Sequence, residues 1–442
     1  VGRSEEDMAV NGNSHEEVSK NGSLNGAAPG APNDTDKWLA ARLLQIVGEP
    51  TVGLELWDGH QVDTPHSEGR PEVHVRLEDR GALYRLLYRP NRTFGELFTQ
   101  GRLTAKGDLV TVMERIYRGL ARADREAGVA KRMAERLLTR RARPNTLQGS
   151  KENIHSHYDL GNEFYELWLD RDYTQYTCAY YPTPTATLEQ AQAAKLELVC
   201  RKLCLKPGET VVEAGSGWGG LARYLVRHYG VKVRSYNIST EQVAYARERA
   251  RREGLDDHIE YVEDDYRNAT GRYDVFVSVG MLEHVGADNY RILGSTIDRC
   301  LKEDGRGLIH SIGQDVSRPL NEWIESYIFP GAYPPTLREM MDIFEPVGLS
   351  VADVENLRPH YAQTLRHWRE RYEANAGRVA EMFDEDFVRA WRLYLCGSVA
   401  AFTEGQLQLF QVLFRRPDCR ILPQTRDHMQ VAFEQETQGA SG

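Results

Sequence analysis

The chain has 442 residues, of which 41% are hydrophobic and 27% charged, and its formal net charge is −10. This composition is typical of a globular protein with room for a full-sized core and more than one domain. The negative charge argues against a general nucleic-acid-binding protein, so no nucleic-acid partner is expected. No apolar run approaches the roughly 20 residues of a membrane-spanning helix, and the first residues lack the pattern of a signal peptide.

Cysteine usage gives no sign of a disulfide scaffold or a metal centre. Six cysteines are too few for a disulfide-stapled fold of this length, so a reducing cytoplasm is the expected compartment. Cys200 and Cys204 are four residues apart on a helical pattern and have no second pair nearby. The sequence therefore predicts no metal site.

The N-terminal third divides into a tail and a small domain. Residues 1–35 are polar, rich in Gly, Asn and Ser and almost free of aromatic residues, which predicts a disordered tail. Residues 36–130 are expected to form a smaller N-terminal domain that is either α+β or mostly helical. Within this domain the patterns predict short strands at 51–59 and 71–77 and helices at 80–90, 94–103 and 108–123.

A basic linker is expected over residues 131–150. Between Lys131 and Arg143 there are six Lys or Arg residues against one Glu, and Pro144 and Gly149 then break the pattern. One interpretation is a solvated helix end. The other is a patch for anionic lipid headgroups, which attract basic residues by about 1 kcal/mol each. Charge alone does not decide between these interpretations.

Residues 151–430 are expected to form a second, larger domain, in which strands alternate with helices from about residue 190. Strands are predicted at 209–215, 231–239, 259–265, 273–282 and 305–313, with helices at 188–203, 220–230, 240–254 and 289–305 between them. This alternation indicates an α/β fold with a doubly wound parallel sheet, whose ligands lie at the carboxyl ends of the strands. Residues 406–416 suit a closing strand, and the helical patterns at 365–383 and 386–402 are expected to cover the site.

The first strand runs into a glycine-rich loop, VVEAGSGWGG at 211–220, whose glycines match G-x-G-x-x-G. For NAD this pattern also requires an acidic residue about 20 residues further on, to bind the ribose. Here the second strand ends in Ser-Tyr-Asn-Ile-Ser, and acidic residues stand instead at Glu213 and Asp264. This arrangement favours a cofactor with an amino group, a ribose and an adenine but no pyrophosphate, namely S-adenosylmethionine.

Several separated blocks carry a resemblance to a known family. They include HYDLGNEFYELWLD, YTCAYY, GSGWGGLA, NISTEQ, SVGMLEHVG, HSIG, YIFPGAYPP and PHYAQTL. In this order the blocks resemble the cyclopropane fatty acid synthase family of S-adenosylmethionine-dependent enzymes over roughly residues 150–420, and FGELFTQGRL extends the likeness to about residue 80. The resemblance implies that residues 151–430 form a Rossmann-like class I methyltransferase domain, which is the catalytic domain, and that residues 36–130 have a role in lipid binding.

The resemblance also implies a set of cofactor-binding residues. They are Tyr176, Thr177, Glu213, Gly215, Ser216, Gly217, Trp218, Gly219, Asn237, Ser239, Gln242 and Asp264. Gln242 opens the helix after the second strand, where its amide can reach ribose hydroxyls. The structural alternative is an ordinary exposed helix residue.

The chemistry of this family requires a base. An isolated alkene is a poor nucleophile, so a sulfonium methyl group must be held in line with it, and ring closure then removes a proton from the added methyl. The resemblance implies bound bicarbonate as that base, held by Cys178, Glu283, His310, the backbone of Ile312 and Tyr361, with His284 beside this set. The structural alternatives are a satisfied strand-end histidine, a core tyrosine and a buried apolar cysteine.

Aromatic residues of the second half are candidates for an acyl channel, with ordinary core packing as the alternative. They are Trp323, Tyr327, Phe329, Tyr333, Trp368 and Tyr372. The resemblance implies an enzyme that adds a methylene group across a cis double bond of phospholipid acyl chains, working as a peripheral protein on the cytoplasmic face of the inner membrane. The alternatives are a sibling enzyme that stops at a methyl or methylene branch, and a non-catalytic lipid-binding protein. A homodimer is left open.

Overall fold

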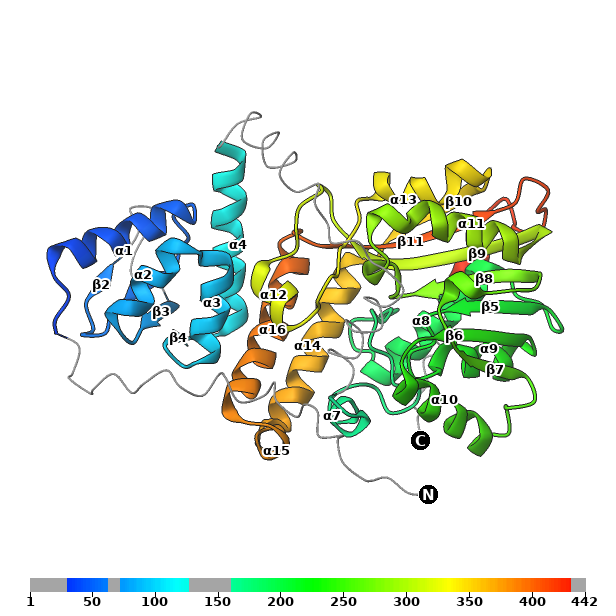
Figure 1. Ribbon diagram of the computed structural model, residues 1–442, viewed down its shortest axis with the longest axis horizontal. Coiled ribbons are helices and arrows are strands. Elements are labelled where there is room, and N and C mark those ends of the chain that lie inside the picture. The colour runs from blue at the N-terminus through cyan, green and yellow to red at the C-terminus, as the bar shows by residue number, and fades with distance from the viewer. Residues whose placement is uncertain (1–29, 63–71, 127–159, 431–442) are drawn as a thin grey trace, which may run out of the picture.

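The computed structural model describes residues 30–62, 72–126 and 160–430. Figure 1 shows an N-terminal part at one end, a large sheet with flanking helices at the other, and a group of helices between them. The expected linker at 131–150 lies outside the described residues, as does most of the expected tail.

The N-terminal part is an α+β unit. Four helices, α1 (Asp34–Ile46), α2 (Arg80–Tyr88), α3 (Pro90–Thr99) and α4 (Leu109–Glu126), pack on a sheet of order β2-β1-β3-β4. Its strands are β1 (Gly53–Glu55), β2 (Gln61–Val62), β3 (His74–Leu77) and β4 (Leu103–Lys106). The predicted helices at α2 and α4 and the strands at β1 and β3 are confirmed. The helix predicted at 94–103 lies earlier, as α3, and Leu103 begins β4 instead, while α1, β2 and β4 were not predicted.

The boundary predicted at residue 35 is wrong. Asn33 caps α1, its side chain accepting a hydrogen bond from the Asp36 N–H at 2.9 Å. The Trp57 indole N–H donates to the Gly30 carbonyl at 2.8 Å. Residues 30–35 therefore belong to the folded N-terminal part.

The large sheet has the strand order β10-β11-β9-β8-β5-β6-β7. The strands are β5 (Thr210–Ala214), β6 (Lys232–Asn237), β7 (Ile259–Glu263), β8 (Tyr273–Val279), β9 (Leu301–Gly313), β10 (Ser350–Asn356) and β11 (Gln408–Arg415). Strands β5 to β9 are parallel, and β11 runs antiparallel to both β9 and β10. The doubly wound sheet and its closing strand are confirmed, while β10 was not predicted.

One predicted boundary in this domain differs from the structure. The helix expected to reach residue 305 ends at Cys300, and β9 begins at Leu301, which pairs with Tyr273 of β8. The pairing then shifts register between Tyr273 and Val275. The pairing of Leu301 with β8 therefore accompanies the end of the helix at Cys300, before the predicted end.

Helices cover both faces of the large sheet. On one face lie α8 (Leu188–Leu203), α9 (Gly220–Tyr229) and α10 (Thr240–Arg252), which share a core with the alternate strand residues Val211, Val233, Val275 and Leu308. On the other face α11 (Tyr290–Cys300) and α13 (Leu337–Phe344) pack on Val212, Phe276, Ile309 and Val412. Because successive residues of a strand point to opposite faces, each strand supplies both cores.

The remaining helices lie between the sheet and the N-terminal part, as Figure 1 shows. They are α7 (Asn162–Glu166), α12 (Glu322–Tyr327), α14 (Arg358–Ala374), α15 (Ala376–Met382) and α16 (Glu385–Thr403). Ion pairs join the two parts, including Arg118 to Glu404 at 2.7 Å and Arg89 to Glu322 at 2.9 Å.

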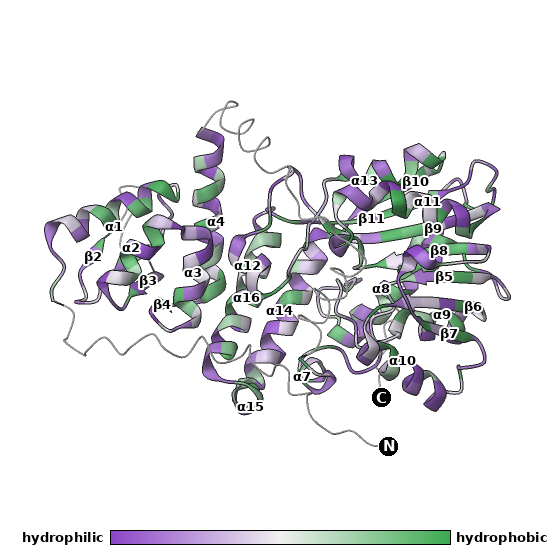
Figure 2. Cartoon of the chain, viewed as in Figure 1, coloured by the Kyte–Doolittle hydropathy of each residue, from purple (hydrophilic) through white to green (hydrophobic). Residues whose placement is uncertain are grey.

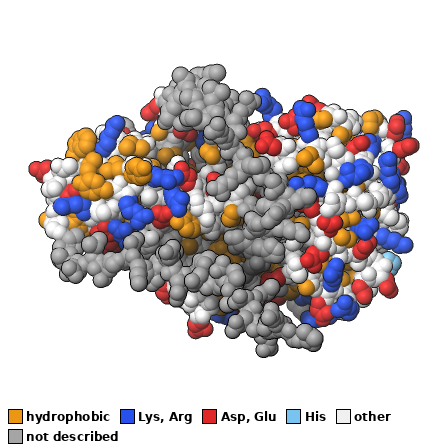
Figure 3. All heavy atoms as spheres, in the orientation of Figure 1, with side chains coloured by type: hydrophobic (Ala, Val, Ile, Leu, Met, Phe, Trp, Pro, Cys, Tyr) orange, Lys and Arg blue, Asp and Glu red, His pale blue; other side chains and the backbone are white. Residues whose placement is uncertain are grey.

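Hydropathy follows this packing. In Figure 2 helix α4 alternates between hydrophobic and hydrophilic residues, and its buried residues are Leu109, Val110, Val112, Met113 and Gly119. Figure 3 shows hydrophobic side chains beside basic ones over the N-terminal part. No helix of the described residues is both long enough and apolar enough to span a bilayer.

Candidate active site

The loops that follow β5 and β8 meet at the point where the strand order reverses. A Cβ atom added at Gly215, directly after β5, would lie 3.0 Å from the Cβ of Met281, which follows β8. In doubly wound sheets, ligands bind in the crevice at this switch point. The glycine loop and the segment that contains Glu283 therefore border the same crevice.

The loop's glycines adopt left-handed backbone geometry for two different reasons. Gly219 has a φ of 77°, and an added Cβ would lie 2.4 Å from the Tyr261 hydroxyl, so packing requires glycine there. Gly217 has a φ of 50°, yet an added Cβ would meet no atom within 4 Å. The open space at Gly217, beside the N-terminus of α9, fits a ligand that approaches the backbone closely.

Asn237, at the end of β6, ties the glycine loop to the start of α10. Its side-chain amide donates to the Ser216 hydroxyl at 3.1 Å, the Gly217 carbonyl at 3.3 Å and the Gln242 amide oxygen at 2.9 Å. Ser239 caps α10 by accepting a hydrogen bond from the Gln242 N–H. Four of the expected cofactor residues thus form one connected network with Gly217.

The two acidic candidates differ in their surroundings. Glu213 is 2% exposed and accepts a hydrogen bond from the Ser235 hydroxyl at 2.5 Å, and burial raises its pKa to about 7. Asp264 follows β7, and its carboxylate accepts hydrogen bonds from the Asp265 N–H and the Asn268 amide. Trp218 donates its indole N–H to Asn162 at 2.8 Å, which joins the loop to α7.

The segment that carries Tyr176 and Thr177 is held by buried charges. The Asp170 carboxylate accepts hydrogen bonds from the N–H groups of three residues between 173 and 175. Lys195 of α8 is fully buried and donates to the Thr177 hydroxyl at 3.0 Å. Burial lowers the pKa of Lys195 to about 8. Lys195 could not be predicted as a site residue, because it lies within a regular helical pattern.

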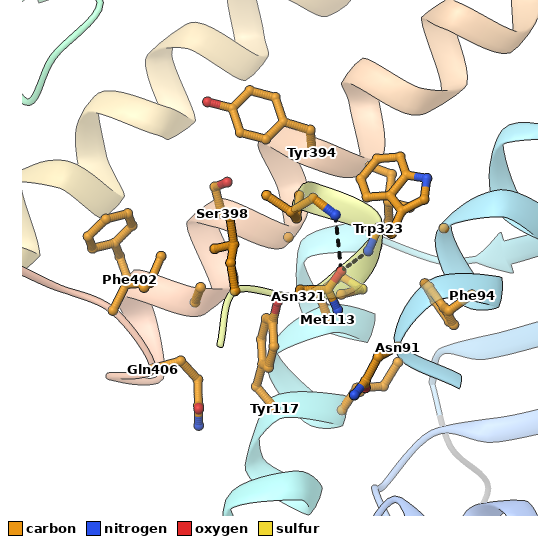
Figure 4. A pocket seen from close by; sticks show the side chains of 18 of the residues that line it. Asn91, Phe94, Met113, Tyr117, Asn321, Trp323, Tyr394, Ser398, Phe402 and Gln406 are labelled. Carbon is orange, nitrogen blue, oxygen red and sulfur yellow. Dashed lines mark hydrogen bonds between the residues drawn. The ribbon is translucent and has the colours of Figure 1, made fainter. Parts of the chain in front are cut away.

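A cavity of about 560 Å³ extends from this crevice into the N-terminal part. Its walls come from α1, α3 and α4 on one side and from α12, α16 and the ends of β8, β9 and β11 on the other. Figure 4 shows Phe94, Met113, Trp323 and Tyr394 around it. The cavity is mostly apolar, and its volume lies within the range typical of small-molecule and lipid sites.

All five expected catalytic residues line this cavity. They are Cys178, Glu283, His310, Ile312 and Tyr361. Tyr176 and Thr177 also line it, whereas the other expected cofactor residues lie along the glycine loop and the ends of β6 and β7. Residues from four separate stretches of the chain are thereby brought together.

Glu283 and His310 each present a buried polar atom without a partner. Glu283 accepts a hydrogen bond from the Ile312 N–H through Oε1 at 2.6 Å, while its Oε2 makes no hydrogen bond within the described residues. His310 is bonded through Nδ1 to Gln411, and its Nε2 likewise has no partner in the described ranges. The Ile312 N–H, which we expected to face a ligand, is therefore engaged by Glu283 in this structure.

Burial determines the ionisation of these groups. It raises the pKa of Glu283 to about 7, and the bond from Ile312 only partly offsets this. It lowers the pKa of His284, which also lines the cavity, to about 4 and holds the pKa of His310 well below its usual value. The Cys178 thiol, whose pKa burial also raises, donates to the Ala179 carbonyl and is a poor nucleophile.

Only two of the six aromatic candidates for an acyl channel line the cavity, and the channel itself stays a prediction. Trp323 and Phe329 line the cavity, but Tyr327 is 52% exposed and donates to Glu96. Tyr333 is bonded to Ser317 and Glu339. Trp368 and Tyr372 are fully buried core residues and do not line the cavity. Aromatic residues at helical spacing here serve mainly as core.

No group of three metal-ligating side chains occurs among residues 30–62, 72–126 and 160–430. The arrangement instead offers a crevice for a polar cofactor and an apolar cavity that ends in a few convergent polar groups.

Solved structures with the same fold are class I methyltransferases. Coclaurine N-methyltransferase matches with a TM-score of 0.62 at 20% identity, over 73% of this chain and 98% of that one. Mycolic acid cyclopropane synthase CmaA1 in complex with SAH and CTAB matches with a TM-score of 0.57 at 29% identity, over 60% of this chain and 98% of that one. The fold is that of a class I S-adenosylmethionine-dependent methyltransferase.

Sequence relatives narrow the class to a family. The model of the mycolic acid cyclopropane synthetase family matches residues 145–412, and the chain belongs to this family. A probable fatty acid methyltransferase of Pseudomonas putida is 36% identical over 85% of this chain and 95% of its own length. The cyclopropane-fatty-acyl-phospholipid synthase of Escherichia coli is 41% identical over 59% of this chain and 66% of its own length.

Family membership decides one of the open alternatives. The chain is an S-adenosylmethionine-dependent methyltransferase by family, so the non-catalytic lipid-binding protein is excluded as its class. The family does not decide which product forms or which lipid is the substrate, so both are inferred below from the geometry of the site.

Proposed function

We propose that this protein transfers a one-carbon unit from S-adenosylmethionine to a cis double bond of phospholipid acyl chains and closes a cyclopropane ring. The observation that carries the proposal is the cavity of about 560 Å³, which joins two unpartnered buried polar atoms at the cofactor crevice to an apolar interior. An acyl chain suits the apolar walls, and its double bond would lie where Glu283 and His310 converge.

The cofactor would be held by residues that already form a rigid frame. The open space at Gly217 admits a ligand against the backbone, and the amide of Gln242 is oriented by Asn237. When bound, S-adenosylmethionine supplies an electrophilic methyl group. The protein's part is to hold that group in line with the alkene and to exclude water from the cavity.

The base in this proposal is a bicarbonate ion beside Glu283. A carboxyl group tolerates a neighbouring anion when one proton is shared between them, and a pKa raised to about 7 allows this near neutral pH. Glu283 Oε2 and His310 Nε2 are the atoms of the described residues that would contact the ion. Cys178 and Tyr361 would close the remaining sides of the cage.

A second candidate is methylation of the alkene without ring closure. The Pseudomonas putida relative, a probable fatty acid methyltransferase, matches over nearly its whole length, which favours this product. The unpartnered Oε2 of Glu283 fits a product whose added methyl loses a proton, which is either the cyclopropane ring or a methylene branch, and argues against a saturated methyl branch.

Lipid analysis of cells that express the protein tests both candidates. The cyclopropane product and a methylene-branched product each gain one CH₂ unit, and hydrogenation under mild conditions followed by mass spectrometry distinguishes the saturated ring from an alkene. Ring-containing phospholipid acyl chains support the first proposal. Branched chains alone establish the second, and unchanged lipids contradict both.

We further propose peripheral attachment to the cytoplasmic face of the inner membrane through the basic stretch from Lys131 to Arg143. Reversing two charges, Arg140→Glu with Arg141→Glu, should weaken sedimentation with phosphatidylglycerol vesicles, because each basic residue contributes about 1 kcal/mol at an anionic surface. Neutral phosphatidylcholine vesicles serve as the control. Equal binding of variant and parent to anionic vesicles would contradict this attachment. The proposal is compatible with either a monomer or a homodimer.

A further inference from the structure

A line of buried polar side chains runs behind His310, away from the cavity. Lys202 of α8 and Gln411 of β11 are each 1% exposed. The Lys202 ammonium donates to the Gln411 amide oxygen at 2.7 Å and also pairs with Glu355 of β10. The Gln411 amide nitrogen lies 3.0 Å from His310 Nδ1. Neither Lys202 nor Gln411 lines the cavity.

The chemistry of these groups fixes each proton in the line. A lysine ammonium carries only donors, so the oxygen of Gln411 must face Lys202 and its NH₂ group must face His310. Since NH₂ is a donor, His310 Nδ1 must be the acceptor and carries no hydrogen. A neutral imidazole without a proton on Nδ1 carries it on Nε2. An imidazolium would place an N–H against the NH₂ group and lose this bond.

We propose that Lys202 and Gln411 are positioning residues that hold His310 as the neutral tautomer protonated on Nε2, so that His310 donates a hydrogen bond into the cavity and does not act as a base. One part of this proposal rests on the proposed function, namely that the His310 Nε2–H faces the groups that react in the cavity. The tautomer itself follows from the contacts at 2.7 and 3.0 Å.

The assignment separates the roles of the two unpartnered atoms. His310 Nε2 already carries a hydrogen and can stabilise negative charge, on an anion or on Glu283. Its Nδ1 is blocked from taking a proton by the amide of Gln411. His310 is therefore not the group that takes up the proton leaving the substrate, and in the proposed reaction an oxygen of Glu283 or of the anion beside it has this role.

The first test measures the tautomer directly. The holoprotein is labelled with ¹⁵N-histidine, the ring nitrogens are observed by NMR, and the His310→Gln variant assigns the His310 signals. We expect a protonated nitrogen at Nε2 and a lone-pair nitrogen at Nδ1. A proton on Nδ1 overturns the proposal. This measurement needs no turnover, so its outcome is independent of the proposed reaction.

The second test inverts the tautomer with a near-isosteric change. In Gln411→Glu a carboxylate can accept from both Lys202 and His310, which places the imidazole proton on Nδ1 and leaves a lone pair toward the cavity. We expect kcat to fall about 100-fold, as for loss of one preorganised donor, with the affinity for S-adenosylmethionine unchanged. Gln411→Met removes the amide, so nothing holds the His310 tautomer, and kcat should also fall.

The matched control is Gln408→Met. Gln408 is also buried in β11, at 4% exposure, but it bonds to Asp315 and Gly405 instead of His310. A kcat for both Gln411 variants within about tenfold of this control overturns the positioning role, because loss of a buried amide alone would then explain the effect.

Discussion

At the scale of single residues, Glu283 is the group on which turnover should depend most. Glu283→Gln keeps the size of the side chain and a partner for the Ile312 N–H, but the amide cannot take up and release a proton. We expect kcat to fall by about 10²- to 10⁴-fold, the range for loss of an acid–base group. The affinity for S-adenosylmethionine, measured by titration calorimetry, should not change.

The control for this variant is Glu339→Gln. Glu339 accepts a hydrogen bond from the Tyr333 hydroxyl at 2.9 Å and does not line the cavity. If the two variants turn over at the same rate, Glu283 has no special role. Retained activity in Glu283→Gln would falsify the proposed anion cage.

Residue types near the site could be predicted from sequence, but their hydrogen-bond partners could not. Glu283 follows one predicted strand and His310 lies near the end of another, so their position at the crevice could be predicted. The bond from Ile312 to Glu283 depends on how the turn after β8 folds against β9. The line from Lys202 through Gln411 depends on the register of β11 with β9, which pairs Gln411 with His310. A single sequence does not fix such a register between strands about 100 residues apart.

At the scale of elements, the loop after β5 contains two glycines with different requirements. Gly219→Ala would force a Cβ into Tyr261 and Ala246, so we expect a clear loss of thermal stability. Gly217→Ala would place its Cβ in open space, with a conformational cost of about 1 kcal/mol. We therefore expect Gly217→Ala to melt near the parent temperature but to bind S-adenosylmethionine more weakly. If Gly217→Ala binds S-adenosylmethionine as tightly as the parent, the cofactor does not bind against this loop.

The junction of β5 and β6 should make stability depend on pH. The pKa of Glu213 is about 7 in the folded protein and near 4.5 when unfolded, so the folded state binds more protons between these values. Stability is then fully present at low pH and falls as pH rises through about 7. Glu213→Gln removes this loss, and we expect the variant to gain about 2 kcal/mol relative to the parent between pH 5.5 and 8.5, most of it below pH 7.

Unfolding of both proteins in urea at pH 5.5, 7 and 8.5 measures this effect. The difference between variant and parent isolates Glu213, because all other ionisable groups are shared. The expected sign is a relative gain by Glu213→Gln at high pH. A pH-independent difference would show that Glu213 is already ionised near pH 7 in the folded protein.

The strands that sequence could not predict, β2, β4 and β10, lie at the edges of their sheets. β2 and β4 have two and four residues, and β10 has the burial pattern of an exposed edge. Such strands exist because a neighbour offers backbone hydrogen bonds, not because their own residues alternate. The central strands were predictable, since their apolar runs are long and their helices follow at regular spacing.

At the scale of the whole molecule, the cavity is made by two parts that sequence reasoning treated separately. Leu44 of α1 and Leu409 of β11 line the same cavity. Sequence predicted that helices α14 and α16 cover the site. It did not predict that α16 also packs against α3 and α4 of the N-terminal part. The N-terminal part therefore contributes walls to the substrate site, and its role in lipid binding can be tested inside the cavity.

Ile116 of α4 offers that test, because it lines the cavity and is only partly buried. Ile116→Trp would fill part of the cavity with little strain on the core. If the acyl chain lies there, kcat/KM for the lipid should fall about 10- to 100-fold, the equivalent of a steric misfit of about 1.5–3 kcal/mol. The affinity for S-adenosylmethionine should not change, since its proposed site lies across the cavity at β5 and β6.

The matched control, Arg122→Trp, adds the same ring to the same helix at a residue that does not line the cavity. Activity on vesicles of unsaturated phospholipid is compared for parent, Ile116→Trp and Arg122→Trp. A selective loss in Ile116→Trp places the acyl chain against the N-terminal part. Equal activity of all three proteins would confine the substrate to the catalytic domain, and the cavity beneath α4 would then be a feature of packing between the two parts.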